Sequence, residues 1–316
     1  MPAVRLAARW VLPVGGAPIA GGAVLIGADG RIAAVGRDAE VPAPDEAPRR
    51  TFPDAIVVPG FVNVHTHLEL TGFEGQVEAD DFAGWIRLLR ELKDQRPTAD
   101  YLAAARRGLA DCWAAGVTTI ADTGDRGVAI RALADAGGSG VAYQEVFGPH
   151  PDQLAVSLAW LKARVTELRE FESPRVRLGV SPHAPYTVSG PLYRAVADYA
   201  RSEGLPLAVH LAESFAETQL VRAAEGPFAE AWQRRGIPLP GLSGRSPVAW
   251  LEQHGVLGED TLCIHLVQVD ADDLARLARA GVAVAHCPLS NRRHGHGDAP
   301  LARLLAAGLR LGVGTD

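Results

Sequence analysis

Apolar runs alternate with helical patterns along most of this chain, and this alternation constrains the fold more than any other sequence feature. Eight runs have the length and residue types of buried strands, at residues 57–67, 117–121, 140–146, 176–181, 206–210, 261–265, 282–286 and 309–314. Apolar residues at helical spacing lie between them, at residues 81–93, 99–115, 153–171, 191–202, 247–254, 271–280 and 300–307. Such alternation is typical of β-α units and a parallel sheet. Eight strands predict an α/β fold of the (β/α)8 TIM-barrel type over residues 57–316.

The first part of the chain has a different texture. Short strand patterns at residues 5–12, 22–27 and 31–36 are separated by Gly-Gly and by a turn at residues 28–30. Residues 42–50, rich in Pro, Asp and Glu, read as a connector. We therefore expect a small β-rich domain, part of a β-sandwich, over residues 1–56. Farther along, residues 226–244 are rich in Gly and Pro and predict a long loop on the active face.

Bulk properties narrow the class of protein. A chain of 316 residues that is 47% hydrophobic can bury a large core. The net charge of −6 and the lack of a dense basic stretch favour neither nucleic acid nor a membrane surface as partner. Three scattered cysteines fit a reducing cytoplasm, and no run reaches the roughly 20 apolar residues of a membrane span. We expect a cytoplasmic protein with a small-molecule partner, and leave open a homo-oligomer.

The predicted strands end in side chains that bind metals or move protons. His65 and His67 are two residues apart, a spacing that points both imidazoles to one face of a strand. A packing role is the simpler interpretation of each histidine taken alone. However, later strands lead into His183, into His210 with Glu213, into His265 and into Asp316. Because the carboxyl ends of barrel strands form one active face, we expect these side chains to converge.

Three histidines and a carboxylate with an open position are typical of a catalytic zinc site. We assign His65, His67, His210 and Asp316 as ligands of one divalent ion, zinc in the first place and iron as the alternative, which would lower the pKa of a bound water. Glu213 is the candidate proton carrier, with a helix-start carboxylate as the alternative. Asp316 would also take part in proton transfer, and His265 would orient the attacking water.

Several motifs in this order resemble the amidohydrolase superfamily, in its branch of cytosine, adenosine and aminofutalosine deaminases and chlorohydrolases. The residues that carry the resemblance are Pro59-Gly60-Phe61-Val62-Asn63 before His65-Thr66-His67, Ser181 to Tyr186, His210 to Glu213, His265-Leu266, Cys287 to Asn291 and Leu311 to Asp316. The resemblance implies a β-rich unit beside a metal-dependent barrel, and the ligand and acid-base roles given above. It also implies that His183 touches the substrate.

Two further checks concern the metal. Binuclear members of this superfamily bridge their metals with a carboxylated lysine at the end of the fourth strand. Residues 176–185 contain no lysine, so we expect a single metal. The His-x-Glu and Pro-Cys-x-x-Cys pattern of the cytidine-deaminase fold is missing, which excludes that fold.

Substrate contacts are harder to derive from the sequence. Glu69 and Trp85 are candidates because they follow the first barrel strand, although their helical spacing equally suggests packing. Residues 291–298 contain two histidines among glycines. They suggest a metal site, a loop over the barrel mouth or, as the simplest interpretation, surface decoration.

Together these residues predict a hydrolase that replaces an exocyclic amine of a purine-like or related heterocycle by oxygen, with release of ammonia. Nucleoside and aminofutalosine deaminases are the most similar branch. The same site would also suit cleavage of a C–Cl, amide or cyclic imide bond, and a non-catalytic barrel used for binding or assembly is the alternative of another class. The family continues past the position of Asp316 with a last helix, so we expect this chain to lack that part and to be unstable or poorly active without it.

Overall fold

A computed structural model describes residues 2–239 and 244–316. The chain divides into two compact units, Met1–Phe61 and Val62–Asp316. Among the described helices, none combines the length and the apolar character needed to cross a membrane.

The first unit is a four-stranded sheet with strand order β3-β2-β1-β4. Its strands are β1 (Val4–Val11), β2 (Ile19–Ile26), β3 (Ile32–Arg37) and β4 (Arg49–Val57). Strand β4 pairs parallel to β1 and lies at an edge. Only its first two residues lie in the connector predicted at residues 42–50, and the strand itself was not predicted from the sequence. Pro53 interrupts its pattern, and an edge strand tolerates a proline because the missing N–H faces no neighbouring strand.

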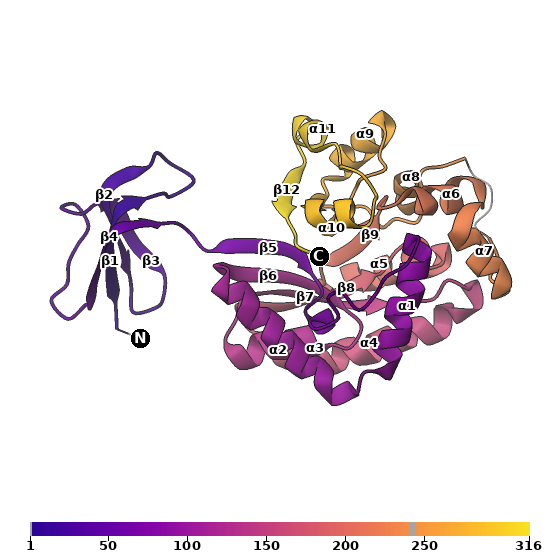
Figure 1. The fold of residues 1–316 in the computed structure, drawn as a ribbon, viewed down its shortest axis with the longest axis horizontal. Helices are drawn as coiled ribbons and strands as arrows, with labels where there is room; N and C mark the ends of the chain where they lie inside the picture. Colours follow the sequence, from indigo (N-terminus) through magenta and orange to yellow (C-terminus); the bar gives the residue numbers. More distant parts are fainter. Residues whose placement is uncertain (1, 240–243) are drawn as a thin grey trace. The chain divides into compact units, whose positions relative to one another are not determined.

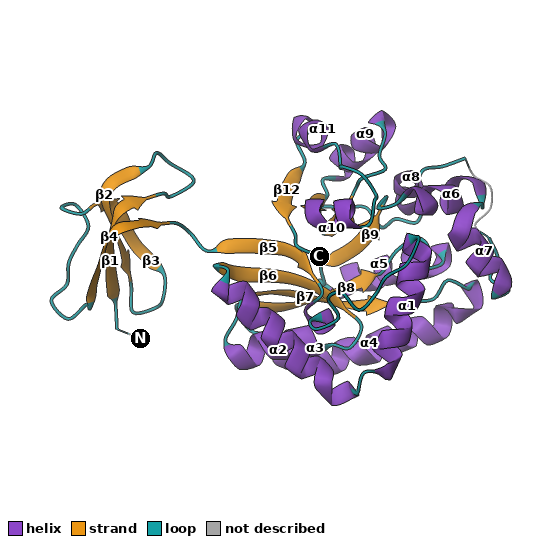
Figure 2. Ribbon diagram, viewed as in Figure 1, coloured by secondary structure: helices purple, strands orange, loops and turns teal. Residues whose placement is uncertain are grey.

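The second unit is built on eight strands in the order β5 to β12, each hydrogen-bonded to the next (Figures 1 and 2). Their bounds are β5 (Phe61–Thr66), β6 (Val117–Gly124), β7 (Gly140–Val146), β8 (Val176–Pro182), β9 (Leu207–Leu211), β10 (Thr261–His265), β11 (Ala283–His286) and β12 (Arg310–Val313). All eight predicted strands are present, so the TIM-type barrel is confirmed. Strand order that follows chain order is what successive β-α units produce.

The first and last barrel strands are joined just beyond β12. The backbone N–H groups of Thr315 and Asp316 each donate to the carbonyl oxygen of His65, at 3.0 Å. Asn63 adds two contacts to Thr315, accepting from its N–H at 3.1 Å and donating to its Oγ1 at 2.8 Å. Gly314 permits the close approach, because a Cβ there would lie 2.9 Å from both Cys287 Sγ and His65 Cβ. These contacts place Asp316 beside the end of β5.

Eleven described α-helices follow the strands and surround the barrel (Figure 2). They are α1 (Phe82–Gln95), α2 (Thr98–Ala114), α3 (Val128–Ala136), α4 (Leu154–Leu168), α5 (Gly190–Glu203), α6 (Phe215–Ala223), α7 (Gly226–Arg234), α8 (Pro247–Gln253), α9 (Ala271–Ala280), α10 (Pro288–Arg293) and α11 (Leu301–Ala306). The short 3-10 helices are η1 (Leu68–Leu70), η2 (Pro151–Gln153) and η3 (Arg169–Phe171).

Helix α7 corrects the prediction of a long loop over residues 226–244. Its Gly-Pro start places a proline in the first turn, where the missing N–H costs nothing. Phe228, Ala229 and Trp232 are buried on one side of the helix. The segment predicted as a loop therefore includes an amphipathic helix. Residues 240–243 of that segment lie outside the described part of the chain.

The core of this unit has two layers. Apolar residues on the outer faces of the strands pack against the helices, as Leu178 and Val209 do in one large buried cluster. A smaller cluster includes Tyr143, Ala208 and Ile264, from β7, β9 and β10. A filled interior of this kind is typical of TIM barrels and leaves the carboxyl ends of the strands to carry chemistry.

Candidate active site

Three histidine rings meet at the carboxyl ends of β5 and β9. The His65 ring centroid lies 4.8 Å from that of His67 and 4.9 Å from that of His210, and the rings of His67 and His210 are stacked. One ligand atom from each of these histidines and one from Asp316 all lie within 4.8 Å of one another. The structure therefore brings together the four residues predicted as metal ligands.

Backbone carbonyls orient two of these rings. His67 Nδ1 lies 2.8 Å from the carbonyl oxygen of Thr123, and His210 Nδ1 lies 3.2 Å from that of His183. A carbonyl only accepts, so each Nδ1 carries the hydrogen and each Nε2 of a neutral ring keeps its lone pair. This arrangement is the one that metal-ligating histidines generally have.

The charges of the cluster suit a cation. Burial lowers the pKa of His65 to about 4, which keeps that ring neutral. Burial also acts to lower the pKa of His67, but the hydrogen bond and charge of Asp316 outweigh it and raise that pKa to about 10. Burial would raise the pKa of Asp316, yet His65 and His67 hold it well below its usual range. The buried carboxylate thus favours a positive charge among the rings.

Left-handed backbone marks the strand ends that carry the site. Ala212, His265, Leu266 and Asp316 have φ values of 51°, 77°, 50° and 66°. Residues other than glycine rarely adopt this conformation, and it persists where surrounding contacts enforce it. Here the N–H of Leu266 donates to Leu211 and that of Val267 to Ala212, at 3.1 and 2.9 Å. Backbone contacts between the ends of β9 and β10 therefore hold the turns after both strands.

Glu213 lies just after this turn, and its carboxylate is buried. Tyr186 donates its hydroxyl hydrogen to Oε2 at 3.2 Å, while Nε2 of His265 and Nε2 of His296 lie 3.5 and 3.4 Å from Oε1. Burial would raise the pKa of Glu213, but the charge of His265 and the contact with His296 lower it. Glu213 and His265 also form a cluster of potential ligands with Asp316. Asp316 thus belongs to both the histidine cluster and the Glu213 cluster.

A second glutamate fixes the backbone of the first. The side chain of Glu217 accepts from the N–H groups of Ala212 and Glu213, at 2.8 and 2.9 Å. Ser214 begins α6 and accepts from the N–H of Glu217. Burial raises the pKa of Glu217 to about 8. The start of α6 therefore holds the backbone of Glu213 at the barrel mouth, a role of Glu217 that the sequence pattern did not indicate.

His265 has a buried partner on α10. Its Nδ1 lies 2.9 Å from Oδ1 of Asn291, whose side chain is fully buried. An amide oxygen accepts, so Nδ1 of His265 carries the hydrogen and Nε2 faces Glu213 and Asp316. The motif ending at Asn291 drew attention in the sequence, but its spacing gave no indication of this contact.

His183 lies beside His210, with ring centroids 4.7 Å apart. Its Nδ1 is 2.8 Å from Oγ1 of Thr187, and its Nε2 is 4.0 Å from Oε1 of Glu145. Burial lowers the pKa of His183 to about 3 and raises that of Glu145 to about 7. Glu145 was missed in the sequence, although it lies near the end of a predicted strand as the other site residues do.

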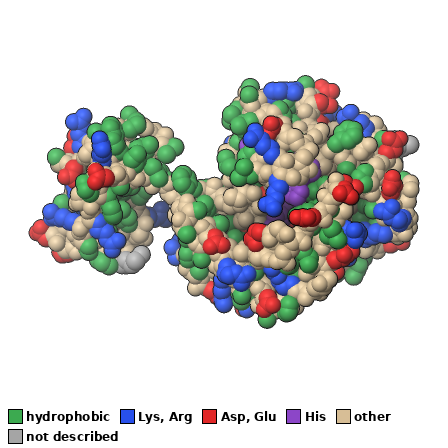
Figure 3. Space-filling model, in the orientation of Figure 1, with side chains coloured by type: hydrophobic (Ala, Val, Ile, Leu, Met, Phe, Trp, Pro, Cys, Tyr) green, Lys and Arg blue, Asp and Glu red, His purple; other side chains and the backbone are tan. Residues whose placement is uncertain are grey.

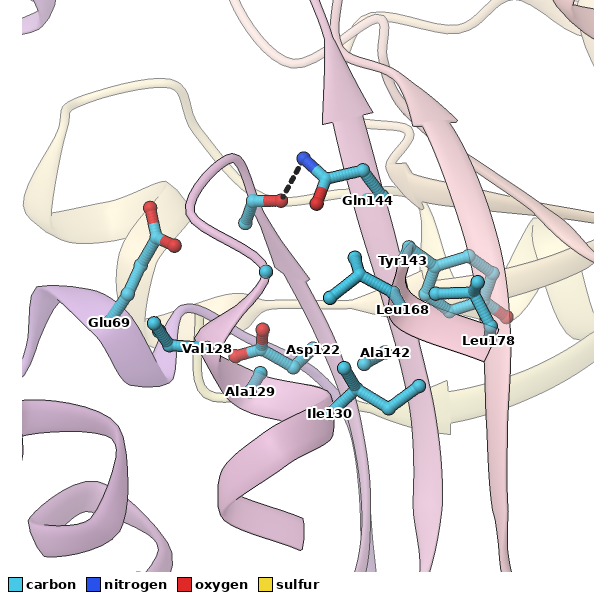
Figure 4. Close-up of a pocket in the computed structure, with 12 residues that line it drawn as sticks. Glu69, Asp122, Val128, Ala129, Ile130, Ala142, Tyr143, Gln144, Leu168 and Leu178 are labelled. Carbon is cyan, nitrogen blue, oxygen red and sulfur yellow. Dashed lines mark hydrogen bonds between the residues drawn. The ribbon is translucent and has the colours of Figure 1, made fainter. Parts of the chain in front are cut away.

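Glu69 makes its hydrogen bonds to the protein. One carboxylate oxygen is 2.8 Å from Lys93 Nζ, and the other accepts from the N–H of Arg126 at 3.1 Å. Lys93 also pairs with Asp125 at 2.8 Å, which ties α1 to the end of β6. Figure 4 shows Glu69 and Asp122 at a small, largely apolar pocket between β6, β7 and α3. Substrate contact by Glu69 stays a prediction.

Aromatic rings gather beside Glu213, on α1 and on the segment after α10. Phe82 stacks on Trp85 at 6.0 Å, and the ring of His294 lies 4.5 Å from that of Trp85. His296 meets Phe82 at 4.5 Å. Figure 3 shows histidine surface in a hollow of the barrel unit, among hydrophobic and charged side chains. Trp85 therefore lies in an aromatic group near the site, and its contact with substrate stays a prediction.

Comparison with known proteins agrees with this geometry. The sequence profile described as "Amidohydrolase family" matches residues 56–316. The chain belongs to the amidohydrolase family. The resemblance noted in the sequence is thereby confirmed for most of this amidohydrolase, including every strand end described above.

Two curated relatives of this amidohydrolase are deaminases by name. It is 36% identical over 299 residues to aminodeoxyfutalosine deaminase of Deinococcus radiodurans, a match that covers 86% of this chain and 68% of the relative. It is 31% identical to 5-methylthioadenosine/S-adenosylhomocysteine deaminase of Thermococcus kodakarensis, covering 83% of this chain and 58% of that relative. The chain thus spans about two thirds or less of the length of these relatives.

Solved structures show the same fold at lower identity. Aminofutalosine deaminase of Helicobacter pylori, in complex with methylthio-coformycin, has a TM-score of 0.87 at 21% identity, over 99% of this chain and 76% of that chain. An adenosine deaminase from Xanthomonas campestris with bound zinc has a TM-score of 0.83 at 24% identity, over 99% and 69%. At these identities the likeness establishes the architecture of this amidohydrolase.

Proposed function

We propose that this amidohydrolase is a metal-dependent deaminase that replaces the exocyclic amine of a purine-like nucleoside by oxygen and releases ammonia. The observation that carries the proposal is the sharing of Asp316 between two clusters, one of three histidines and one of Glu213 and His265. A metal-binding group and a proton-carrying group thus meet at one carboxylate, as a hydrolytic reaction at an amine-bearing carbon requires.

The donor set fits a single divalent ion such as zinc. His65, His67 and His210 would supply nitrogen ligands, two of them with the Nδ1–H group already bound to a carbonyl. Asp316 would supply an oxygen. When bound, the metal would act as a Lewis acid and lower the pKa of a water towards neutrality.

Glu213 would carry protons during the reaction. It would pass a proton to the ring nitrogen next to the amine-bearing carbon, and help to protonate the amine as it leaves as ammonia. Water supplies the oxygen and the hydrogens, so amine plus water gives the oxo product plus ammonia. His265 and Asp316 would accept or hold hydrogens of the attacking water, since His265 Nε2 lies 3.8 Å from Asp316 and 3.5 Å from Glu213.

The substrate class is inferred from the relatives and from the lining of the site. Both curated relatives named above are deaminases, of aminodeoxyfutalosine and of 5-methylthioadenosine or S-adenosylhomocysteine. Aromatic rings at Phe82, Trp85 and Tyr186 offer stacking surface of the kind that heterocycles use. His183, beside the histidine cluster, is the proposed substrate contact.

A substrate panel tests the proposal. Zinc-loaded protein would be assayed for ammonia release from adenosine, 5-methylthioadenosine, S-adenosylhomocysteine and aminodeoxyfutalosine, with cytosine, guanine, a chlorotriazine and a cyclic imide as comparisons. We expect turnover of at least one of the four adenine nucleosides. For the four comparison compounds we expect a kcat/KM at least a hundredfold lower. Chloride release or imide hydrolysis in place of ammonia release would overturn the deaminase assignment. A lack of any turnover with metal bound would favour a binding protein.

A further inference from the structure

His296 lies in a segment that the sequence suggested was surface decoration, yet its side chain is 4% exposed. It is flanked by Gly295 and Gly297, whose φ values of 69° and 100° suit glycine. These two residues let the chain reverse direction on either side of the histidine. The glycines in this segment therefore serve to turn His296 into the barrel mouth.

The backbone of His296 is fixed at both of its polar groups. Its N–H donates to the carbonyl oxygen of Asn291 at 2.8 Å, and its own carbonyl oxygen accepts from Nε2 of Gln268 at 2.9 Å. The ring packs edge-on against Phe82, with centroids 4.5 Å apart. Contacts from α10, from the end of β10 and from α1 thus set the position of the ring.

The ring nitrogen Nε2 of His296 lies close to the carboxylate of Glu213. Nε2 lies 3.4 Å from Oε1 of Glu213 and makes no hydrogen bond of normal geometry with any described residue. Such a buried polar atom without a partner is uncommon in folded proteins. Contacts in active sites are often long without substrate and shorten when it binds. We therefore attribute the position of this nitrogen to an interaction with the Glu213 carboxylate during the reaction.

Asn291 couples the two histidines that flank this oxygen. Its side chain contacts Nδ1 of His265, and its backbone carbonyl accepts from the N–H of His296. His265 and His296 both face Oε1 of Glu213, while Tyr186 donates to Oε2. The buried residue Asn291 thus contacts both histidines whose rings face Oε1 of Glu213, and so fixes their positions relative to each other.

We propose that His296 is a positioning residue that holds the Glu213 carboxylate, through Nε2, in the orientation needed for proton transfer. The proposal rests on the proposed role of Glu213 in deamination. A carboxylate with one donor rotates among several orientations, and a donor to Oε1, beside the Tyr186 hydroxyl on Oε2, would restrict it to the one facing the reacting atoms. His296 acts in this way through Glu213 and leaves the binding of the heterocycle to other groups.

Two substitutions separate the ring nitrogen from the ring itself. His296→Phe keeps an aromatic ring against Phe82 but lacks Nε2, and His296→Gln supplies an amide nitrogen at similar reach. With zinc-loaded protein, we expect His296→Phe to lower kcat about 10- to 100-fold with KM within about threefold, the range for loss of one hydrogen bond to a charged group. His296→Gln should stay within about fivefold of the wild-type kcat. His150→Gln, at a histidine with a 30% exposed side chain, serves as control; zinc content and melting temperature should be unchanged in all three variants.

Unchanged kcat in His296→Phe would overturn the proposal, and so would equal losses in the Phe and Gln variants, which would indicate ring packing alone. A rise in KM at constant kcat would instead make His296 a substrate contact. An independent measurement covers the case in which no substrate of the panel reacts. In ¹⁵N-histidine-labelled, zinc-loaded protein, the ring signals of His296 should shift between wild type and Glu213→Gln; unshifted signals would contradict the contact itself.

Discussion

The two sides of the site are built in different ways. On the histidine side, His65, His67 and His210 lie at or directly beyond strand ends, and backbone carbonyls orient two of the rings. On the carboxylate side, the Glu213 carboxylate is contacted by side chains from two separate loops, Tyr186 and His296. The first side is fixed by the barrel, and the second by contacts between connections that follow different strands.

This difference predicts how the geometry of each side responds to amino-acid substitutions. Barrel strands resist displacement because their hydrogen bonds and packing are shared with neighbouring strands. Loop contacts depend on a few side chains, and one substitution alters them without disturbing the strands. The histidine side should therefore keep its geometry when the carboxylate side is damaged, and the following experiments test that separation.

Removal of the metal should have the largest effect, because it disables the histidine side completely. We expect chelation to abolish turnover and zinc to restore it. A metal that binds only the folded state stabilises it by about 4 kcal/mol at a free concentration a thousand times its Kd. Calorimetry should accordingly record a lower melting temperature for the metal-free protein. His210→Asn, assayed in parallel, should fail to regain full zinc content; normal metal content in that variant would contradict the ligand assignment.

Glu213→Gln should have the next largest effect and should leave the histidine side intact. The amide retains the shape of the side chain but cannot carry the proton, so we expect kcat to fall about 10³-fold, within the range of general acid-base catalysis. Zinc content, measured by atomic absorption, should remain at one ion per chain. Glu225→Gln, at an exposed position before α7, is the matched control. Equal rates for both variants would show that Glu213 is not the proton carrier.

Asn63→Ala should have the smallest effect. It should affect both the histidine side and the carboxylate side, because Asn63 holds the segment that carries Asp316. Loss of its two contacts to Thr315 should reduce stability by about 1–3 kcal/mol and lower zinc affinity. Urea unfolding of Asn63→Ala, Thr315→Val and the double variant would give the coupling energy, which we expect to be about 1 kcal/mol. Strictly additive effects would mean that the two side chains do not act on one another.

The histidine side was predictable from sequence because each ligand occupies a defined position relative to a strand. His65, His67, His210 and Asp316 were identified from spacing and strand ends, and the structure gathers them. Glu213 and His265 followed from the same rule. The position of the fold's eight strands was likewise predictable, since each is a short apolar run between helices.

The carboxylate side was less predictable because its members meet through loops. His296 looked like part of a polar, glycine-rich surface segment, and that interpretation is wrong, as the ring is buried. Nothing in the sequence linked Asn291 to His265, 26 residues away. Edge strand β4 and helix α7 were missed for a related reason: Pro53 and the Gly-Pro start of α7 give local signals for turns, which tertiary packing overrides.

The left-handed residues after β9 and β10 also bear on how far this barrel can be stabilised. Each unusual backbone conformation of this kind costs about 1–3 kcal/mol, a substantial part of the 5–15 kcal/mol by which a typical domain is stable. Ala212, His265 and Leu266 all adopt it where the chemistry is sited. These three positions therefore lower stability at the edge of the barrel that carries the proposed site, and packing and hydrogen bonds elsewhere in the barrel offset that cost.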